Sequence, residues 1–165
     1  MLRFLFIALS LILPSCGGKM EPDVSSIASL SDIPEGAEVE VLLKTYYRDM
    51  SDRDWEAYRS HFWDNATITT AWQQPGDSTS SVDVTVIDDF ILETPNGPDS
   101  QPIFEETMKD SKITVNGNLA EAWVTYQAKF GSPDSLIRWT GTDVFTLLRH
   151  ECEWKIVSLV FESGN

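Results

Sequence analysis

Histidine and cysteine are scarce in this chain, whose 165 residues contain only two of each. Two cysteines cannot build a disulfide framework, and two histidines cannot build a histidine-rich metal site. We therefore expect no metal and no cofactor. The sequence also lacks a phosphate-binding glycine loop, a nucleophile elbow and the spacing of a metal-ligand motif. These absences argue against a kinase, a hydrolase and a metalloenzyme.

Basic residues are also few. Lysine and arginine total 12 against 26 acidic residues, which gives a formal net charge of −14. A surface this acidic repels phosphate, so we expect no nucleic acid as a partner. An anionic substrate would need a local patch of bases, and none is visible in the sequence.

The apolar run at the N-terminus is too short to span a bilayer. It extends from Phe4 to Leu13 behind one base, Arg3, which is the build of a signal peptide. It leads into Leu13-Pro14-Ser15-Cys16, which resembles the bacterial lipobox. In such signals the chain is cut before the cysteine, whose thiol is then acylated. The alternative is a plain secretory signal in which the cysteine is incidental.

We predict three segments from this start: a signal peptide over 1–15, a lipidated Cys16 with a flexible tether over 16–36, and one domain over 37–165. Removing 1–15 takes away one base, so the charge changes from −14 to −15. The acyl chains, rather than the acidic surface, would then hold the membrane. The predicted location is the bacterial cell envelope, anchored at Cys16 to the outer membrane or at the periplasmic face.

Aromatic residues, by contrast, are abundant, with six Trp, eight Phe and four Tyr. Rings at this density need a packed interior or a lined pocket. The first apolar pattern has steps of three and four residues, which predicts an amphipathic helix. It comprises Val39, Leu42, Leu43, Tyr46, Tyr47 and Met50. A polar break over 51–54 caps a second helix that carries Trp55, Tyr58 and Phe62 on one side.

After Asn65 the hydrophobic period changes to two, which indicates strands. We predict strands over 66–72 and 82–86, a short helix over 87–92, and strands over 103–115, 119–130, 136–149 and 154–161. Asn116-Gly117 is a strong signal for a tight turn between two of them. Two helices, two strands, a helix and four strands make an α+β domain.

Three segments carry a resemblance to a known family. They are Phe62-Trp63-Asp64-Asn65-Ala66-Thr67-Ile68, the stretch from Gly141 to Arg149, and Trp154-Lys155-Ile156-Val157-Ser158. In this order they resemble the SnoaL-like branch of the nuclear transport factor 2-like superfamily, over residues 37–162. The resemblance implies a cone-shaped, curved antiparallel sheet, a cystatin-like roll, wrapped around the N-terminal helix pair. An apolar pocket is then expected at the wide end of the cone.

The rings on the predicted strands are the candidates for lining this pocket. They are Trp72, Trp123, Tyr126, Trp139, Phe145 and Phe161. Packing in an ordinary core is the alternative for each of them.

The resemblance to steroid isomerases of this superfamily implies Tyr46 and Asp143 as hydrogen-bond donors to an oxyanion. The position of the proton-shuttling base falls on Thr70, whose hydroxyl cannot accept a proton at neutral pH. Glu105 or Glu106, at the start of the next long strand, could substitute, but nothing in the spacing favours them. Alternation places Asp143 with Gly141 and Phe145 on the face towards the pocket, where an apolar wall would raise its pKa. SnoaL-like cyclases use a His–Asp pair, so His61 is the third catalytic candidate, with a satisfied helix-end histidine as its alternative.

Three functions follow from this sequence. The leading one is binding of a small apolar or aromatic molecule in the pocket. The first alternative is a lyase or isomerase that acts on a carbonyl compound through Tyr46 and Asp143. The second alternative is a non-catalytic interaction domain that forms a homodimer through the open face of the sheet.

Overall fold

The computed structural model describes residues 36–72 and 81–163. The predicted signal peptide, Cys16 and residues 17–35 of the predicted tether lie outside the described residues. The helices are α1 (Ala37–Asp52), α2 (Trp55–Ser60) and α3 (Ile87–Glu93), with short 3-10 turns at Thr94–Asn96 and Pro98–Ser100. The strands are β1 (Phe62–Trp72), β2 (Ser81–Val86), β3 (Ile103–Asn116), β4 (Leu119–Ser132), β5 (Ser135–His150) and β6 (Glu153–Ser163).

The described strands form one sheet in the order β2-β1-β6-β5-β4-β3. Tight turns join β3 to β4, β4 to β5 and β5 to β6, so these pairs are antiparallel, as is β1 with β2. The pairing of β1 with β6 is parallel, which departs from the predicted all-antiparallel sheet. A hairpin fixes the direction only of strands that follow each other, and β1 and β6 are distant in the chain.

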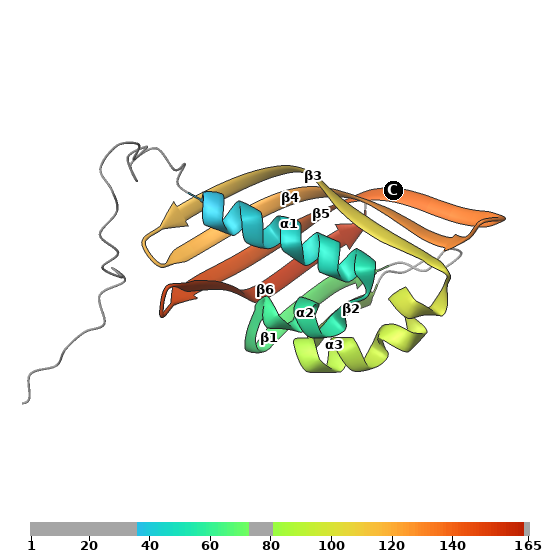
Figure 1. Ribbon diagram of the computed structural model, residues 1–165, viewed down its shortest axis with the longest axis horizontal. Coiled ribbons are helices and arrows are strands. Elements are labelled where there is room, and N and C mark those ends of the chain that lie inside the picture. Colours follow the sequence, from blue (N-terminus) through green and yellow to red (C-terminus); the bar gives the residue numbers. More distant parts are fainter. Residues whose placement is uncertain (1–35, 73–80, 164–165) are drawn as a thin grey trace, which may run out of the picture.

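The described helices lie on one face of the sheet. Figure 1 shows α1 lying across the long strands. The helices α2 and α3 lie beside β1 and β2, near the C-terminal end of α1. The break between α1 and α2 is capped as predicted, because the Asp54 carboxylate accepts a hydrogen bond of 3.0 Å from the backbone N–H of Ala57. The α+β class and the curved sheet around the N-terminal helices are confirmed.

The core lies between α1 and the inner face of the sheet. On β4, Ala120, Ala122, Val124, Tyr126 and Ala128 are buried and alternate with exposed residues. Period-two patterning therefore assigns one face of this strand to the core. From α1, the side chains of Val39, Leu43 and Tyr46 pack into the same core.

The opposite face of the sheet carries exposed apolar side chains. One row crosses five strands in register, from Trp123 through Val144, Val160 and Thr69 to Val84. We call it the outer row. Trp123 is 51% exposed there, so it is not the pocket residue that the sequence suggested. Its neighbours Ala122 and Val124 occupy the inner face, and alternation turns Trp123 away from it.

Among the described residues, no helix has the length and apolar character needed to cross a membrane.

Candidate functional site

An inner cavity of about 200 Å³ lies between the helices and the inner face of the sheet. Its lining comes from all three helices and from β1, β3, β4, β5 and β6. The lining residues are Tyr46, Met50, Tyr58, Ile68, Phe90, Pro98, Phe104, Glu106, Tyr126, Asp143, Leu159 and Phe161. Most of them are aromatic or aliphatic, and two are acids.

Asp143 is the first of these acids. It lies on β5, on the inner face as alternation predicts, and is only 2% exposed. The hydroxyl of Tyr47 on α1 donates a short hydrogen bond to its Oδ2 atom. Burial raises the pKa of Asp143 to about 7, although the Tyr47 hydrogen bond acts in the opposite direction. The carboxyl therefore exchanges its proton near neutral pH.

Glu106 is the second acid, which the sequence offered, together with Glu105, only as a substitute base that no spacing favoured. It lies on β3 between Phe104 and Met108, which share its face. Ser51 of α1 fixes its backbone, because the Ser51 hydroxyl donates to Glu106 O and accepts from Glu106 N, both at 2.9 Å. Burial, and to a lesser extent the charge of Asp143, raises the pKa of Glu106 to about 8.

Tyrosine hydroxyls supply the other polar groups of the cavity. Tyr58 donates to the Tyr46 hydroxyl at 3.3 Å, and Trp139 Nε1 donates to the Tyr126 hydroxyl at 3.4 Å. Burial raises the pKa of Tyr46, Tyr58 and Tyr126 above the ordinary tyrosine value, so these hydroxyls stay neutral. The inner cavity thus combines apolar rings with a few groups that donate or accept single hydrogen bonds.

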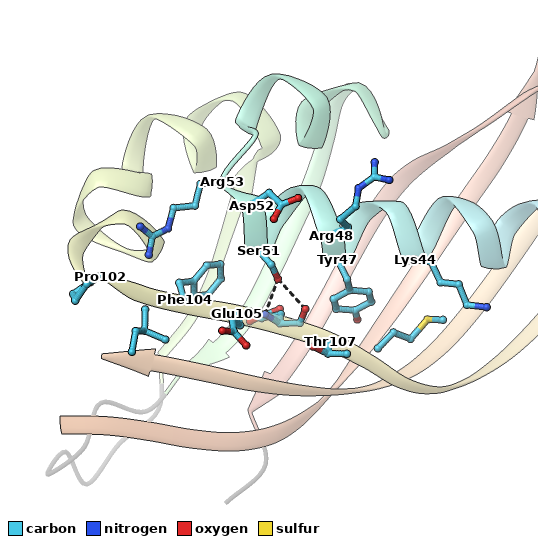
Figure 2. Close-up of a pocket in the computed structure, with 13 residues that line it drawn as sticks. Lys44, Tyr47, Arg48, Ser51, Asp52, Arg53, Pro102, Phe104, Glu105 and Thr107 are labelled. Atoms are coloured by element: carbon cyan, nitrogen blue, oxygen red, sulfur yellow. Dashed lines mark hydrogen bonds between the residues drawn. The ribbon is translucent and has the colours of Figure 1, made fainter. Parts of the chain in front are cut away.

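A larger open groove of about 810 Å³ lies between α1 and β3, on the other side of Phe104 and Glu106. We call it the α1–β3 groove. Figure 2 shows Lys44 and Arg48 extending from α1, Tyr47 pointing towards the strands, and the two hydrogen bonds made by Ser51. Phe104 and Glu106 line both the groove and the inner cavity, so together they form the wall between them.

The bases of this groove already have acidic partners. Lys44 pairs with Glu40 at 2.6 Å, and Arg48 pairs with Asp49 at 2.7 Å. Arg53 lies 3.5 Å from Asp99 and also donates to the backbone oxygen of Gln101 at 2.7 Å. The groove therefore offers no cluster of uncommitted positive charge.

The predicted donors Tyr46 and Asp143 both line the inner cavity, but the hydroxyl bonded to Asp143 belongs to Tyr47. The Tyr46 hydroxyl instead accepts a hydrogen bond from Tyr58. The Tyr46 ring packs edge-on against Phe145, with 5.2 Å between the ring centroids. Successive residues of a helix point about 100° apart, which sends the two adjacent tyrosines to different partners.

His61 lies away from the inner cavity. Its Nε2 atom is 2.8 Å from the Oδ2 atom of Asp49, a buried acid on α1. Burial raises the pKa of Asp49, but hydrogen bonds from His61 and Arg48 outweigh this and lower it overall. The pair joins the end of α2 to α1, and neither residue lines the inner cavity, so the catalytic role of His61 stays a prediction.

The remaining pocket candidates lie in different places. Tyr126 and Phe161 line the inner cavity, whereas Trp139 adjoins it through its bond to Tyr126. Phe145 is fully buried in the core, outside the cavity lining. Thr70 is not among the lining residues, and its buried Oγ1 atom has no hydrogen-bond partner among the described residues. The side chain of Trp72 lies outside what the structure describes.

Alternation could have distinguished Glu106 from its exposed neighbour Glu105 as the residue that faces the cavity. Phe104, Glu106 and Met108 follow a strict period of two, which places Glu106 on an apolar face of β3. Tyr47 and Tyr58 were assigned only to apolar helix faces, and no sequence signal tells which partner a helical tyrosine meets. Among the described residues, no group of three or more potential metal ligands occurs.

A cavity lined by rings, between a helix layer and a curved sheet, gives this α+β fold the usual build of a small-molecule pocket. The chain matches the family described as "Putative lumazine-binding" over residues 34–162, and it belongs to that family. Small-molecule binding fits this family. No relative of the chain is found among curated proteins.

Solved structures show the same fold. A hexachlorocyclohexane dehydrochlorinase, LinA-type3, from Novosphingobium barchaimii has a TM-score of 0.64 at 12% identity, covering 79% of this chain and 87% of its own. The β subunit of benzoate 1,2-dioxygenase from Burkholderia mallei scores 0.60 at 12% identity, with coverages of 86% and 94%. An NTF-2 like protein of unknown function from Silicibacter pomeroyi scores 0.55 at 21% identity, with coverages of 79% and 96%. The superfamily is as predicted, and the SnoaL-like branch stays a prediction.

Proposed function

We propose that this protein binds a small aromatic molecule in the inner cavity, as an exported protein anchored in the bacterial cell envelope. The observation that carries the binding proposal is the lining itself. Three tyrosines and three phenylalanines surround the space, and the two acids among them favour their neutral forms up to about pH 7 and 8. A mostly apolar site with a few polar anchors is the usual build of a small-molecule site.

The size of the cavity limits the ligand. Its volume of about 200 Å³ is below the roughly 300–1,000 Å³ of pockets for drug-sized ligands. It corresponds to about seven water molecules at ~30 Å³ each. A ligand of one or two rings fits such a space. Lumazine, which the family description names, is a two-ring heteroaromatic molecule and is therefore a suitable first probe.

Filling the cavity is expected to abolish binding. Leu159 lines the cavity and is 3% exposed, so Leu159→Trp would place a large ring in the ligand's space. We expect the affinity for lumazine or for 2-phenylethanol, measured by isothermal titration calorimetry, to fall by about 10-fold or more. Val157→Trp is the matched control, because Val157 is on the same strand and 38% exposed.

Circular dichroism separates loss of binding from loss of folding, since overpacking itself destabilises by about 1–3 kcal/mol. Phe161→Trp, at a partly exposed lining position, provides a second block if Leu159→Trp does not fold. A folded blocked variant that binds as tightly as the wild type would refute the inner cavity as the site.

Acylation of Cys16 is the expected basis of anchoring. We expect Cys16→Ser to move the protein from the membrane fraction to the soluble fraction, as judged by fractionation and immunoblotting of cells. The intact mass of the native protein should show the acyl chains. Cys152 is the only other cysteine in the chain, so a disulfide between the two would compete for the same sulfur. A native mass without acyl chains contradicts the anchor.

Two further interpretations stay predictions. The outer row offers Trp123, Val160 and Val84 as exposed apolar contacts for a homodimer, and light scattering of the purified domain would measure its mass. A lyase or isomerase would need a base, and Thr70, which the resemblance put in that position, is not among the residues that line the cavity.

A further inference from the structure

The inner cavity holds two acids and no base. Among the described residues that line it, Asp143 and Glu106 are the acids, and none is a lysine, an arginine or a histidine. Buried acids are ordinarily paired with a cation or satisfied by several hydrogen bonds, because an isolated buried charge is very unfavourable. Without such a partner the two carboxyls keep their protons to near-neutral pH, and a cation in the cavity would favour their ionised forms.

Neither carboxyl is fully satisfied by the protein. Asp143 is 98% buried (2% exposed), and only its Oδ2 atom receives a hydrogen bond from the described residues. The carboxyl of Glu106 makes no hydrogen bond or ion pair to the described residues; only its backbone is bonded, to Ser51. Acceptor positions on both carboxyls are thus left for an occupant of the cavity.

The nearby bases are engaged elsewhere. On α1, Lys44 and Arg48 face the α1–β3 groove and pair with Glu40 and Asp49. Arg53, after α1, pairs with Asp99 at 3.5 Å. On α2, Arg59 pairs with Asp64 and Asp88 at 2.9 and 2.5 Å.

The other titratable groups facing the acids are tyrosines, namely Tyr46 and Tyr47 from α1, Tyr58 from α2 and Tyr126 from β4. A tyrosine is neutral or negatively charged, so none of these four side chains supplies positive charge to the acids.

The rest of the lining also suits a cation. Six aromatic side chains surround the space, from Tyr46, Tyr58, Phe90, Phe104, Tyr126 and Phe161. The faces of such rings carry negative partial charge and attract organic cations. The net charge of −14 further concentrates cations around the protein and repels anions.

We propose that the ligand is a small aromatic amine whose protonated nitrogen pairs with the carboxyls of Asp143 and Glu106. This proposal rests on the proposed function and adds the charge of the ligand to it. A neutral aromatic ligand gives the carboxyls no counter-charge when they ionise, and an anionic one is repelled by the ionised carboxyls. A single ammonium group has three N–H donors, which is enough to serve an acceptor on each of the two carboxyls that line the cavity.

Amine binding is then coupled to proton release. In the empty cavity both carboxyls hold their protons to near-neutral pH, and a bound cation favours their ionised forms. A simple amine stays protonated to about pH 10. Its affinity should therefore increase from pH 5.5 to pH 8.5, and its binding near pH 7 should release protons.

Three probes with one skeleton test the proposal: 2-phenylethylamine as the cation, 2-phenylethanol as the neutral analogue and phenylacetate as the anion. We expect calorimetry at pH 8.5 to show the amine binding about 10-fold more tightly than the alcohol. This advantage should shrink at pH 5.5, and phenylacetate should not bind. Titrations in two buffers of different ionisation enthalpy would measure the released protons.

Glu106→Gln keeps the size of the side chain and removes its charge. It should weaken amine binding by about 10-fold at pH 8.5 and leave alcohol binding within about twofold. Glu105→Gln is the matched control, because Glu105 is the exposed neighbour on β3 and pairs with Lys129 at 2.5 Å. It should leave both affinities unchanged.

The possible outcomes separate the two proposals. Equal binding of amine and alcohol at both pH values, unchanged by Glu106→Gln, overturns the cationic ligand and leaves the aromatic site standing. If neither these aromatic probes nor lumazine bind, the proposed function fails, and the cationic ligand fails with it. A Glu105→Gln effect as large as that of Glu106→Gln would show a general surface charge effect and would also overturn the proposal.

Discussion

The protein is expected to lose stability as the pH rises from about 5 to 9, and Asp143→Asn is expected to remove much of that loss. The pKa of Asp143 is about 7 in the folded protein and 3.8 for an ordinary aspartate. Between these values the unfolded chain has released a proton that the folded protein still holds. Raising the pH therefore favours the unfolded state, by about 1.4 kcal/mol per pH unit for one proton.

The interval between the two pKa values corresponds to a decrease of about 2–4 kcal/mol in the free energy of unfolding from Asp143 alone. This decrease is complete above pH 7. Glu106, whose pKa is about 8, adds to the loss in the same direction. Asn has no proton to lose and keeps an oxygen that can accept the Tyr47 hydrogen bond. The variant should thus be more stable than the wild type at pH 9 and similar to it at pH 5.

Urea denaturation at pH 5, 7 and 9 measures this effect. Asp83→Asn is the matched control, since Asp83 is exposed on β2 and its replacement changes the net charge equally. Subtracting the control removes the general repulsion of a protein with a charge of −14. Equal pH profiles for wild type and Asp143→Asn would show that Asp143 is ionised in the folded state at neutral pH.

The inward orientation of Asp143 could be predicted from the sequence because side chains alternate between the two faces of a strand. Residues two apart share a face, so a polar residue between Gly141 and Phe145 in an apolar alternation had to face inward. The same rule excludes Trp123 from the pocket, where it was placed only because it is an aromatic residue on a predicted strand. Trp123 and Tyr126 are three residues apart, so in a regular strand they cannot share the inner face, and Trp123 lies outside.

The helices and strands, in their order along the chain, could be predicted because their hydrophobic patterns are regular. The predicted strands at 103–115 and 119–130 correspond to β3 at Ile103–Asn116 and β4 at Leu119–Ser132. What the sequence could not provide is contact between distant elements. Nothing local to Tyr47 indicates that it reaches Asp143, 96 residues later, while its neighbour Tyr46 meets Tyr58. The same holds for Ser51, which fixes the backbone of Glu106.

Gly141→Ala is expected to destabilise the protein and to close the inner cavity. The ring of Tyr126 lies directly over Gly141, its partner across β4 and β5. A Cβ atom at Gly141 would lie 2.4 Å from Cζ and Oη of Tyr126, and 2.5 Å from the backbone oxygen of Glu162. Contacts this short cannot persist, so the Tyr126 ring must move and the backbone near Glu162 must shift. Overpacking of this kind destabilises by about 1–3 kcal/mol.

The direction in which Tyr126 moves determines the effect on binding. The sheet backbone closes one side of the ring, and the inner cavity is the adjacent open space that it lines. The displaced ring should enter that space and break its 3.4 Å hydrogen bond from Trp139. We therefore expect Gly141→Ala to lower both the free energy of unfolding and the affinity for 2-phenylethanol, the latter by about 10-fold or more.

Two controls isolate the contact between Gly141 and Tyr126. Gly97→Ala adds the same methyl group where the nearest atom is 3.8 Å away, so it should destabilise the protein less than Gly141→Ala does. Tyr126→Leu removes the ring atoms that clash, so the added cost of Gly141→Ala should be smaller in the Tyr126→Leu background. The double-mutant cycle measures this coupling. An equal cost in both backgrounds would assign the strain to the Glu162 backbone instead of the ring and would predict an open, binding-competent cavity in Gly141→Ala.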